Sequence, residues 1–193
     1  MMLPFTQLES SRKEPNETAE REIEKAGHQI GAQCGMLILE SGGMHMIYTD
    51  RTRRAMMLAY KAHQGQVDKA GVPYVFHPIH LAEQMKDEVT CCAALLHDTV
   101  EDTGVRLEQI YEAFGRDVGD VVAHLTHDKS VPYMDYIKEV KKDPRAVQVK
   151  LADLHHNMDI HRYDGLDLSE EEKKRIEMRL KQKYEPALKY LMA

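Results

Sequence analysis

The stretch TCCAALLHDTVEDT, residues 90–103, decides the fold of this chain. From Cys91 to Leu96 every residue is small or apolar, so a helix formed here is apolar on all sides and has to be buried among other helices. Thr90 is a residue type that caps helix N-termini, and the pattern predicts that the helix begins there. The same helix then continues into a histidine and three acids, which is costly for a buried segment.

The polar end of this predicted helix has a regular spacing. Positions three and four residues apart lie on one broad side of two successive turns, and four polar residues follow that spacing: His97, Asp98, Glu101 and Asp102. Negative charge is also disfavoured at a helix C-terminus. Two interpretations stay open from this helix alone: the acids share a divalent cation, or the helix surfaces and the acids are solvated.

A second polar cluster favours the cation. In VKLADLHHNMD, residues 149–159, four side chains share one helix face among apolar neighbours: Lys150, Asp153, His156 and Asn157. A carboxylate buried at Asp153 has the same need for a counter-charge. The segment YVFHP, residues 74–78, adds His77 as a candidate ligand from a loop. His77, His97, Asp98 and Asp153 would offer two imidazole nitrogens and two carboxylate oxygens. This ligand set suits manganese, iron or zinc better than calcium.

Helical periodicity continues through most of the chain after residue 48. Gly115 is expected to stop a helix that begins near residue 106, and Pro78 suits the first position of another. Ser169 and Glu172 form a capping-box pair for a last helix that runs to about residue 191. No alternating segment long enough for a sheet core appears. We therefore predict an all-α fold, a compact bundle of about seven or eight helices.

The domain organisation changes near SGG, residues 41–43. We expect residues 1–45 to be an N-terminal extension that is loosely structured, with the alternative that Met46 is the natural first residue. Residues 46–193 are expected to form the functional domain. The oligomeric state is left open by the sequence.

Composition limits the class of partner. The chain has 193 residues and a formal net charge of −6, so we expect neither nucleic acid nor a membrane as a partner. The N-terminus lacks the pattern of a secretion signal. Three cysteines, two of them adjacent, form no disulfide framework and indicate free thiols in a reducing cytoplasm: Cys34, Cys91 and Cys92.

Five motifs occur in order along the chain: HQGQ at 63–66, PYVFHP at 73–78, ALLHDTVEDT at 94–103, FG at 114–115 and VKLADLHHNM at 149–158. In this series the sequence resembles the hydrolase domain of Rel/SpoT-type alarmone enzymes, and most of all the stand-alone small alarmone hydrolases. The resemblance implies an HD-domain fold with one divalent metal ion, usually Mn²⁺. It also implies cleavage of the 3′-pyrophosphate from guanosine tetra- or pentaphosphate, which leaves GDP or GTP.

The resemblance also assigns roles to residues. The implied metal ligands are His77, His97, Asp98 and Asp153. Glu101 and Asp102 match the acids that position or deprotonate the attacking water. Residues expected to contact the phosphorylated nucleotide are Lys69, Lys150, Asn157 and Arg175. His63 and His80 do not match the loop ligand, so a core or surface role is expected for them.

Two departures from the family pattern leave the substrate open. The family commonly has an arginine where this chain has Asp68, and another where it has Leu154. An acid provides neither the stacking nor the phosphate pairing of a guanidinium. The first alternative is therefore the same chemistry on another nucleotide, such as an adenosine alarmone or the 2′-phosphate of NADPH. The second alternative is a catalytically silent, metal-binding nucleotide sensor.

Overall fold

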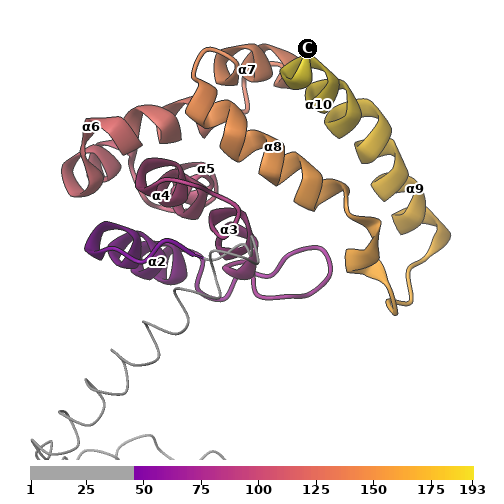
Figure 1. The fold of residues 1–193 in the computed structure, drawn as a ribbon. Helices are drawn as coiled ribbons and strands as arrows, with labels where there is room; N and C mark the ends of the chain where they lie inside the picture. The colour runs from indigo at the N-terminus through magenta and orange to yellow at the C-terminus, as the bar shows by residue number, and fades with distance from the viewer. Residues whose placement is uncertain (1–45) are drawn as a thin grey trace, which may run out of the picture. The chain divides into compact units, whose positions relative to one another are not determined.

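The computed structural model describes residues 46–193 (Figure 1), and the predicted extension 1–45, with Cys34, lies outside them. These residues contain no β-strand, and Val67 and Pro73 form one isolated bridge. The all-α prediction is confirmed. The elements in chain order are α2 (Asp50–Ala62), α3 (Phe76–Ala82), α4 (Glu88–Leu96), α5 (Thr99–Asp102), α6 (Leu107–Leu125), α7 (Tyr133–Val140), α8 (Pro144–Met158), the 3₁₀ turn η1 (Ile160–Tyr163), α9 (Glu170–Arg179), the π-type turn η2 (Leu180–Tyr184) and α10 (Glu185–Met192).

Helix α4 lies at the centre of the bundle, as its apolar sequence predicts. It packs against α2, α3, α6 and α8, and the segment from Thr90 to Leu96 is buried throughout. Cys91 and Cys92 are free thiols in this core, and burial raises the pKa of each, to about 11 and about 12. The polar residues that follow Leu96 therefore emerge from the most buried helix of the molecule.

The start of α4 differs from the prediction that Thr90 is its cap. The helix begins at Glu88, and Asp87 is the N-cap residue. The Asp87 side chain accepts hydrogen bonds from the backbone N–H of Thr90 at 2.9 Å and from its hydroxyl at 2.6 Å. Aspartate is as good a cap as threonine, so the cap lies one turn earlier and Thr90 supports it.

The end of α4 also differs, because one continuous helix over residues 90–102 was expected. The chain breaks at His97 and Asp98, where Asp98 has φ −102° and ψ −2°. Side-chain donors replace part of the helical ladder: the Thr99 hydroxyl donates to the carbonyl of Leu96 at 2.7 Å. The break turns two polar residues out of the helix and toward neighbouring elements.

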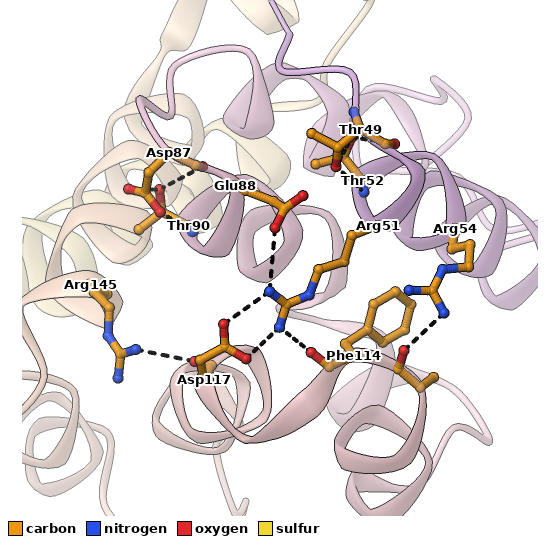
Figure 2. Close-up of polar contacts among 11 residues, drawn as sticks. Thr49, Arg51, Thr52, Arg54, Asp87, Glu88, Thr90, Phe114, Asp117 and Arg145 are labelled. Carbon is orange, nitrogen blue, oxygen red and sulfur yellow. Dashed lines mark hydrogen bonds and ion pairs between the residues drawn. The ribbon is translucent and has the colours of Figure 1, made fainter.

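A charged network at the start of α4 joins four helices, α2, α4, α6 and α8 (Figure 2). The guanidinium of Arg51, in α2, lies 3.4 Å from Glu88 in α4 and donates to Asp117 and to the carbonyl of Phe114 in α6. Arg145 donates to the backbone carbonyl of Asp117 at 3.2 Å. This network fixes α2 and α6 around the start of α4.

Helix α6 is two helical segments joined at Gly115, where φ is 81° and ψ is 172°. A left-handed φ of this kind favours glycine, which confirms the expected stop at this residue. The second segment packs closely, because a Cβ at Gly119 would lie 2.4 Å from the ring of Tyr111. Its apolar side, with Val118, Val121 and Val122, is buried in the core.

The C-terminal segment α9–η2–α10 packs against α8 through η2 and α10 (Figure 1). It starts at the predicted capping box, in which Ser169 accepts from the backbone N–H of Glu172 and the Glu172 side chain accepts in return. Within the residues that the structure describes, none of the helices combines the length and the apolar character needed to cross a bilayer.

Candidate functional site

A cleft of about 630 Å³ lies where the polar clusters of the sequence meet. Its walls are the loop between α2 and α3, the break after α4, the polar side of α8, the turn η1 and the C-terminal segment α9–η2. Nine of the ten residues predicted to act line it: Lys69, His77, Asp98, Glu101, Asp102, Lys150, Asp153, Asn157 and Arg175. The tenth, His97, lies directly behind Asp98 and is buried.

Three predicted ligands form a compact group that could hold a metal ion. His77, His97 and Asp98 each offer one ligand atom, and these atoms all lie within 4.8 Å of one another. His77 comes from the first turn of α3, while the other two come from the break after α4. The break is therefore what brings the pair at 97–98 toward α3.

The orientation of His97 fits a cation. Its Nδ1 hydrogen-bonds the carbonyl of Ala94 at 2.8 Å, which leaves the lone pair of the neutral ring on Nε2. Nε2 is 2.9 Å from Oδ2 of Asp98, yet it has no hydrogen-bond partner in the part of the chain described. A proton on Nε2, or a metal ion that both atoms bind, stabilises this approach of the ring to the Asp98 carboxylate.

His77 is oriented by a second histidine. The Nδ1 atoms of His77 and His156 are 2.7 Å apart, and Nε2 of His77 is 3.2 Å from Oδ1 of Asp153. Burial lowers the pKa of His156 to about 4 and so favours a neutral acceptor ring. With His156 as the partner of its Nδ1, His77 presents Nε2 to the Asp153 carboxylate and to the metal group, the arrangement common for ligating histidines.

Asp153, the fourth predicted ligand, lies beside His77 but outside the compact three-residue group. Its Oδ2 is 2.7 Å from Nζ of Lys150, and its Oδ1 accepts from Asn157. Burial opposes its ionisation, but Lys150 and His77 outweigh burial and hold the pKa of Asp153 well below its usual range. It is therefore an ionised carboxylate at the edge of the group.

The acids around His97 favour a positive charge on its ring. Burial alone would lower the pKa of His97, but Asp98 and then Asp153 raise it to about 9. The potential that stabilises a proton on Nε2 also stabilises a cation at the same place. Tyr74 donates its hydroxyl to Oδ2 of Asp98, a contact that sequence spacing did not reveal although PYVFHP contains the residue.

The two acids predicted to act on water have different surroundings. Glu101 is partly buried, and its Oε2 accepts the backbone N–H of His127 at 3.1 Å. Asp102 is more exposed, and its carboxylate lies 3.3 Å from Nζ of Lys129. Both belong to α5, one turn after Asp98. Glu101 is held in place within the cleft, whereas Asp102 lies at its rim.

The predicted nucleotide contacts divide into paired and unpaired groups. Lys150 and Asn157 both contact Asp153, and Lys150 is buried. Lys69, in the loop between α2 and α3, and Arg175, in α9, are exposed in the cleft and have no ion pair within residues 46–193. Sequence spacing missed three further cations of the lining: Arg162, Arg179 and Lys183.

The chain is similar to several proteins of known name. It is 40% identical over 124 residues to a probable GTP pyrophosphokinase of Mycobacterium leprae, which covers 58% of this chain and 16% of that protein. It is 34% identical over 123 residues to the bifunctional (p)ppGpp synthase/hydrolase SpoT of Escherichia coli, which covers 56% of this chain and 18% of SpoT. A probable guanosine-3′,5′-bis(diphosphate) 3′-pyrophosphohydrolase of Synechocystis is 34% identical, over 69% of this chain and 19% of the relative. The chain thus spans less than a fifth of each of these curated relatives.

A solved structure gives fuller coverage. It is described as a metazoan ortholog of SpoT that hydrolyzes ppGpp, and it matches with a TM-score of 0.58 and 26% identity. The match covers 76% of this chain and 96% of the solved one. A family model for the HD domain matches residues 55–186, which include every predicted site residue. The family match, together with the His-His-Asp group in the cleft, shows that the chain belongs to the HD domain family.

Proposed function

We propose that this chain is a metal-dependent phosphohydrolase that removes the 3′-pyrophosphate of guanosine tetra- or pentaphosphate and leaves GDP or GTP. The observation that carries the proposal is the group of His77, His97 and Asp98 within 4.8 Å, with Glu101 one turn away in the same cleft. The ppGpp hydrolysis named for the structural relative supports the same activity. The Mycobacterium leprae relative is named a probable GTP pyrophosphokinase and SpoT a synthase/hydrolase, but a water-activating acid beside a metal group favours hydrolysis.

The residues divide the work between holding an ion and moving a proton. We propose His77, His97, Asp98 and Asp153 as ligands of one divalent ion, and Mn²⁺ as that ion because of their mixed imidazole and carboxylate set. A bound divalent ion supplies Lewis-acid stabilisation of negative charge on the phosphoryl group. The Glu101 carboxylate accepts a proton from the attacking water as this water bonds to phosphorus and the bond to the 3′-oxygen breaks. The leaving 3′-oxygen takes up a proton, from Glu101 or from solvent, and becomes the 3′-hydroxyl of the product. Asp102 orients that water.

The nucleotide is proposed to bind between two walls of the cleft. Lys69 and Arg175 are exposed and without ion pairs in residues 46–193, and they neutralise phosphate charge from the α2–α3 loop and from α9. Lys150 and Asn157 both contact the Asp153 carboxylate, so any contact that they make with the nucleotide lies next to Asp153. Their first role is to keep Asp153 ionised and oriented. The buried free thiols Cys91 and Cys92 support a reducing compartment, the cytoplasm, for this reaction.

A panel of nucleotides tests the proposal. Purified chain with Mn²⁺ is incubated with ppGpp, pppGpp, an adenosine alarmone and NADPH, and release of pyrophosphate or phosphate is measured. Pyrophosphate release from ppGpp that Asp98→Ala and Glu101→Ala abolish supports the proposed function. Glu108→Gln, an exposed change in α6, serves as the control and retains turnover.

The panel also separates the alternatives. If the chain hydrolyses NADPH or the adenosine alarmone but not ppGpp, its substrate is another nucleotide and the chemistry is unchanged. Bound Mn²⁺ with no turnover of any nucleotide supports the silent sensor. Full activity of the Glu101 variant contradicts the role given to that carboxylate.

A further inference from the structure

The loop between α2 and α3, residues 63–75, is built around Asp68. Its Oδ1 accepts the backbone N–H groups of Ala70 and Val72, each at 2.9 Å. The backbone N–H of Asp68 donates in turn to the carbonyl of Val72 at 2.8 Å. One carboxylate oxygen thus organises the tip of the loop, as aspartate does in tight turns.

The other carboxylate oxygen of Asp68 connects this loop to a distant segment. Oδ2 accepts from Nη2 of Arg162, which lies in η1. Nη1 of Arg162 donates to the backbone carbonyl of His156 at 3.2 Å, near the C-terminal end of α8. The side chains of Asp68 and Arg162 are only 12% and 16% exposed, and both line the cleft. The pair therefore joins the wall that carries Lys69 to the helix that carries Asp153.

Arg162 differs from Lys69 and Arg175 because its charge is already matched by a carboxylate. Both of its Nη atoms are occupied, one by the Asp68 carboxylate and one by a carbonyl. Lys69 and Arg175 have no such partner within residues 46–193. Arg162 is consequently arranged to hold the loop rather than to bind a phosphate.

We propose that Asp68 and Arg162 form a positioning pair that holds loop 63–75 against the end of α8, so that Lys69 faces the phosphates of the bound nucleotide. This inference rests on the proposed function. Lys69 follows Asp68 directly, and Tyr74, which donates to Asp98, ends the same loop. The pair acts on substrate binding through Lys69. The acid at position 68 thereby has a role in this chain that needs no contact with the substrate.

Steady-state kinetics on ppGpp with Mn²⁺ test the pair as a double-mutant cycle. Asp68→Asn keeps an acceptor for Ala70 and Val72 but removes the charge, and Arg162→Gln removes the guanidinium. We expect each single variant to raise KM about tenfold, with kcat within about twofold of the unmodified chain. The double variant is expected to be no worse than either single variant, because both remove one interaction. Arg162→Lys, which keeps the charge, is expected to recover part of the loss.

A matched control removes an Arg–Asp ion pair that lies away from the cleft. Arg145 pairs with Asp143, whose carboxylate also accepts a backbone N–H, and neither residue lines the cleft. Arg145→Gln is expected to leave KM for ppGpp unchanged. Additive losses from Asp68→Asn and Arg162→Gln, or a loss in kcat alone, would overturn the proposal.

Amide hydrogen exchange separates failure of this inference from failure of the proposed function. Arg162→Gln is expected to speed exchange at least tenfold across residues 66–75 and to leave α4 unchanged. This measurement needs no turnover. If the unmodified chain does not hydrolyse ppGpp, the proposed function fails while exchange still decides whether the pair holds the loop. Unchanged exchange across residues 66–75 refutes the pair in either case.

Discussion

Tyr74 shows what a single side chain adds to the candidate metal group. Its hydroxyl donates to Oδ2 of Asp98, the oxygen that also faces His97. Burial, followed by the charge of Asp98, raises the pKa of Tyr74 far above its usual range, so the hydroxyl remains a donor at every working pH. A donor of this kind fixes one rotamer of a ligating carboxylate.

Removal of this hydroxyl is therefore expected to weaken metal binding. We predict that Tyr74→Phe raises the Kd for Mn²⁺ about tenfold, measured by calorimetry on the metal alone. Tyr60→Phe is the matched control, because Tyr60 is 57% exposed on α2 and does not line the cleft. An unchanged Kd in Tyr74→Phe would show that Asp98 is oriented without it.

Sequence spacing predicted the residues of the site better than their partners. His77, His97 and Asp98 lie together as expected. His97 and Asp98 directly follow the buried helix α4, and the family resemblance selected His77 among the loop histidines. The Tyr74–Asp98 and Asp68–Arg162 contacts join residues 24 and 94 positions apart. No helical period relates such positions, so only the packed structure reveals them.

At the scale of elements, the hydrophobic periodicity of the sequence did not predict the break between α4 and α5. A continuous helix would keep the polar groups of residues 97–102 on one side of a single axis. In the structure the Thr99 hydroxyl and the His97 ring bond backbone carbonyls of α4, and the chain turns between Leu96 and Thr99. These side-chain bonds compete with the helical ladder, an effect that a hydrophobic pattern does not encode.

The close packing of α6 predicts a stability defect at one glycine. A Cβ at Gly119 would lie 2.4 Å from the Tyr111 ring and 2.9 Å from its Cγ, so the ring has to move as a whole. We expect Gly119→Ala to lower the free energy of unfolding by about 1–3 kcal/mol, measured with urea. Gly104→Ala is the control, since nothing lies within 4 Å of its added Cβ. Equal stability of the two variants would contradict this packing.

The Arg51 network of Figure 2 predicts a pH-dependent contribution to stability. The hydrogen bond from Arg51 holds the pKa of Asp117 below its usual range in the folded chain. In the unfolded chain the pKa of this carboxyl group is about 4, and the pair stabilises the fold fully above that pH. The stabilisation is lost as the pH falls through the lower pKa that Asp117 has in the folded chain.

Asp117→Asn tests this sign. We expect it to lower the free energy of unfolding at pH 7 by less than about 1 kcal/mol, because Asp117 is 46% exposed and solvent screens the pair. The difference from the unmodified chain should shrink as pH falls through the folded pKa of Asp117. Urea titrations from pH 7 down to about 3 measure it. A difference that does not vary with pH would mean that charge plays no part in the pair.

For the whole molecule, the all-α architecture followed from the sequence because α4 is apolar on every side and needs a layer of helices around it. The cleft did not follow, since it depends on where the loop 63–75, η1 and the α9–η2 segment meet. Loops and turns carry few periodic signals, yet they provide Lys69 and Arg162. The sequence thus predicted which side chains meet at the candidate metal group, but it did not predict the shape of the cleft.

The candidate metal group joins α3 to the break after α4, with α8 beside it, so metal binding should stabilise the fold as a unit. A ligand that binds only the folded chain at about 100 times its Kd adds about 2.7 kcal/mol, or roughly 5–10 °C in Tm for a chain of this size. We expect Mn²⁺ to raise Tm by this amount in calorimetry, and EDTA to reverse the increase. His97→Ala should abolish the shift, whereas Glu101→Gln should keep it, because Glu101 is proposed to act on water and not to hold the ion. Loss of the shift in both variants would make Glu101 a ligand, and an undiminished shift in His97→Ala would place the ion elsewhere.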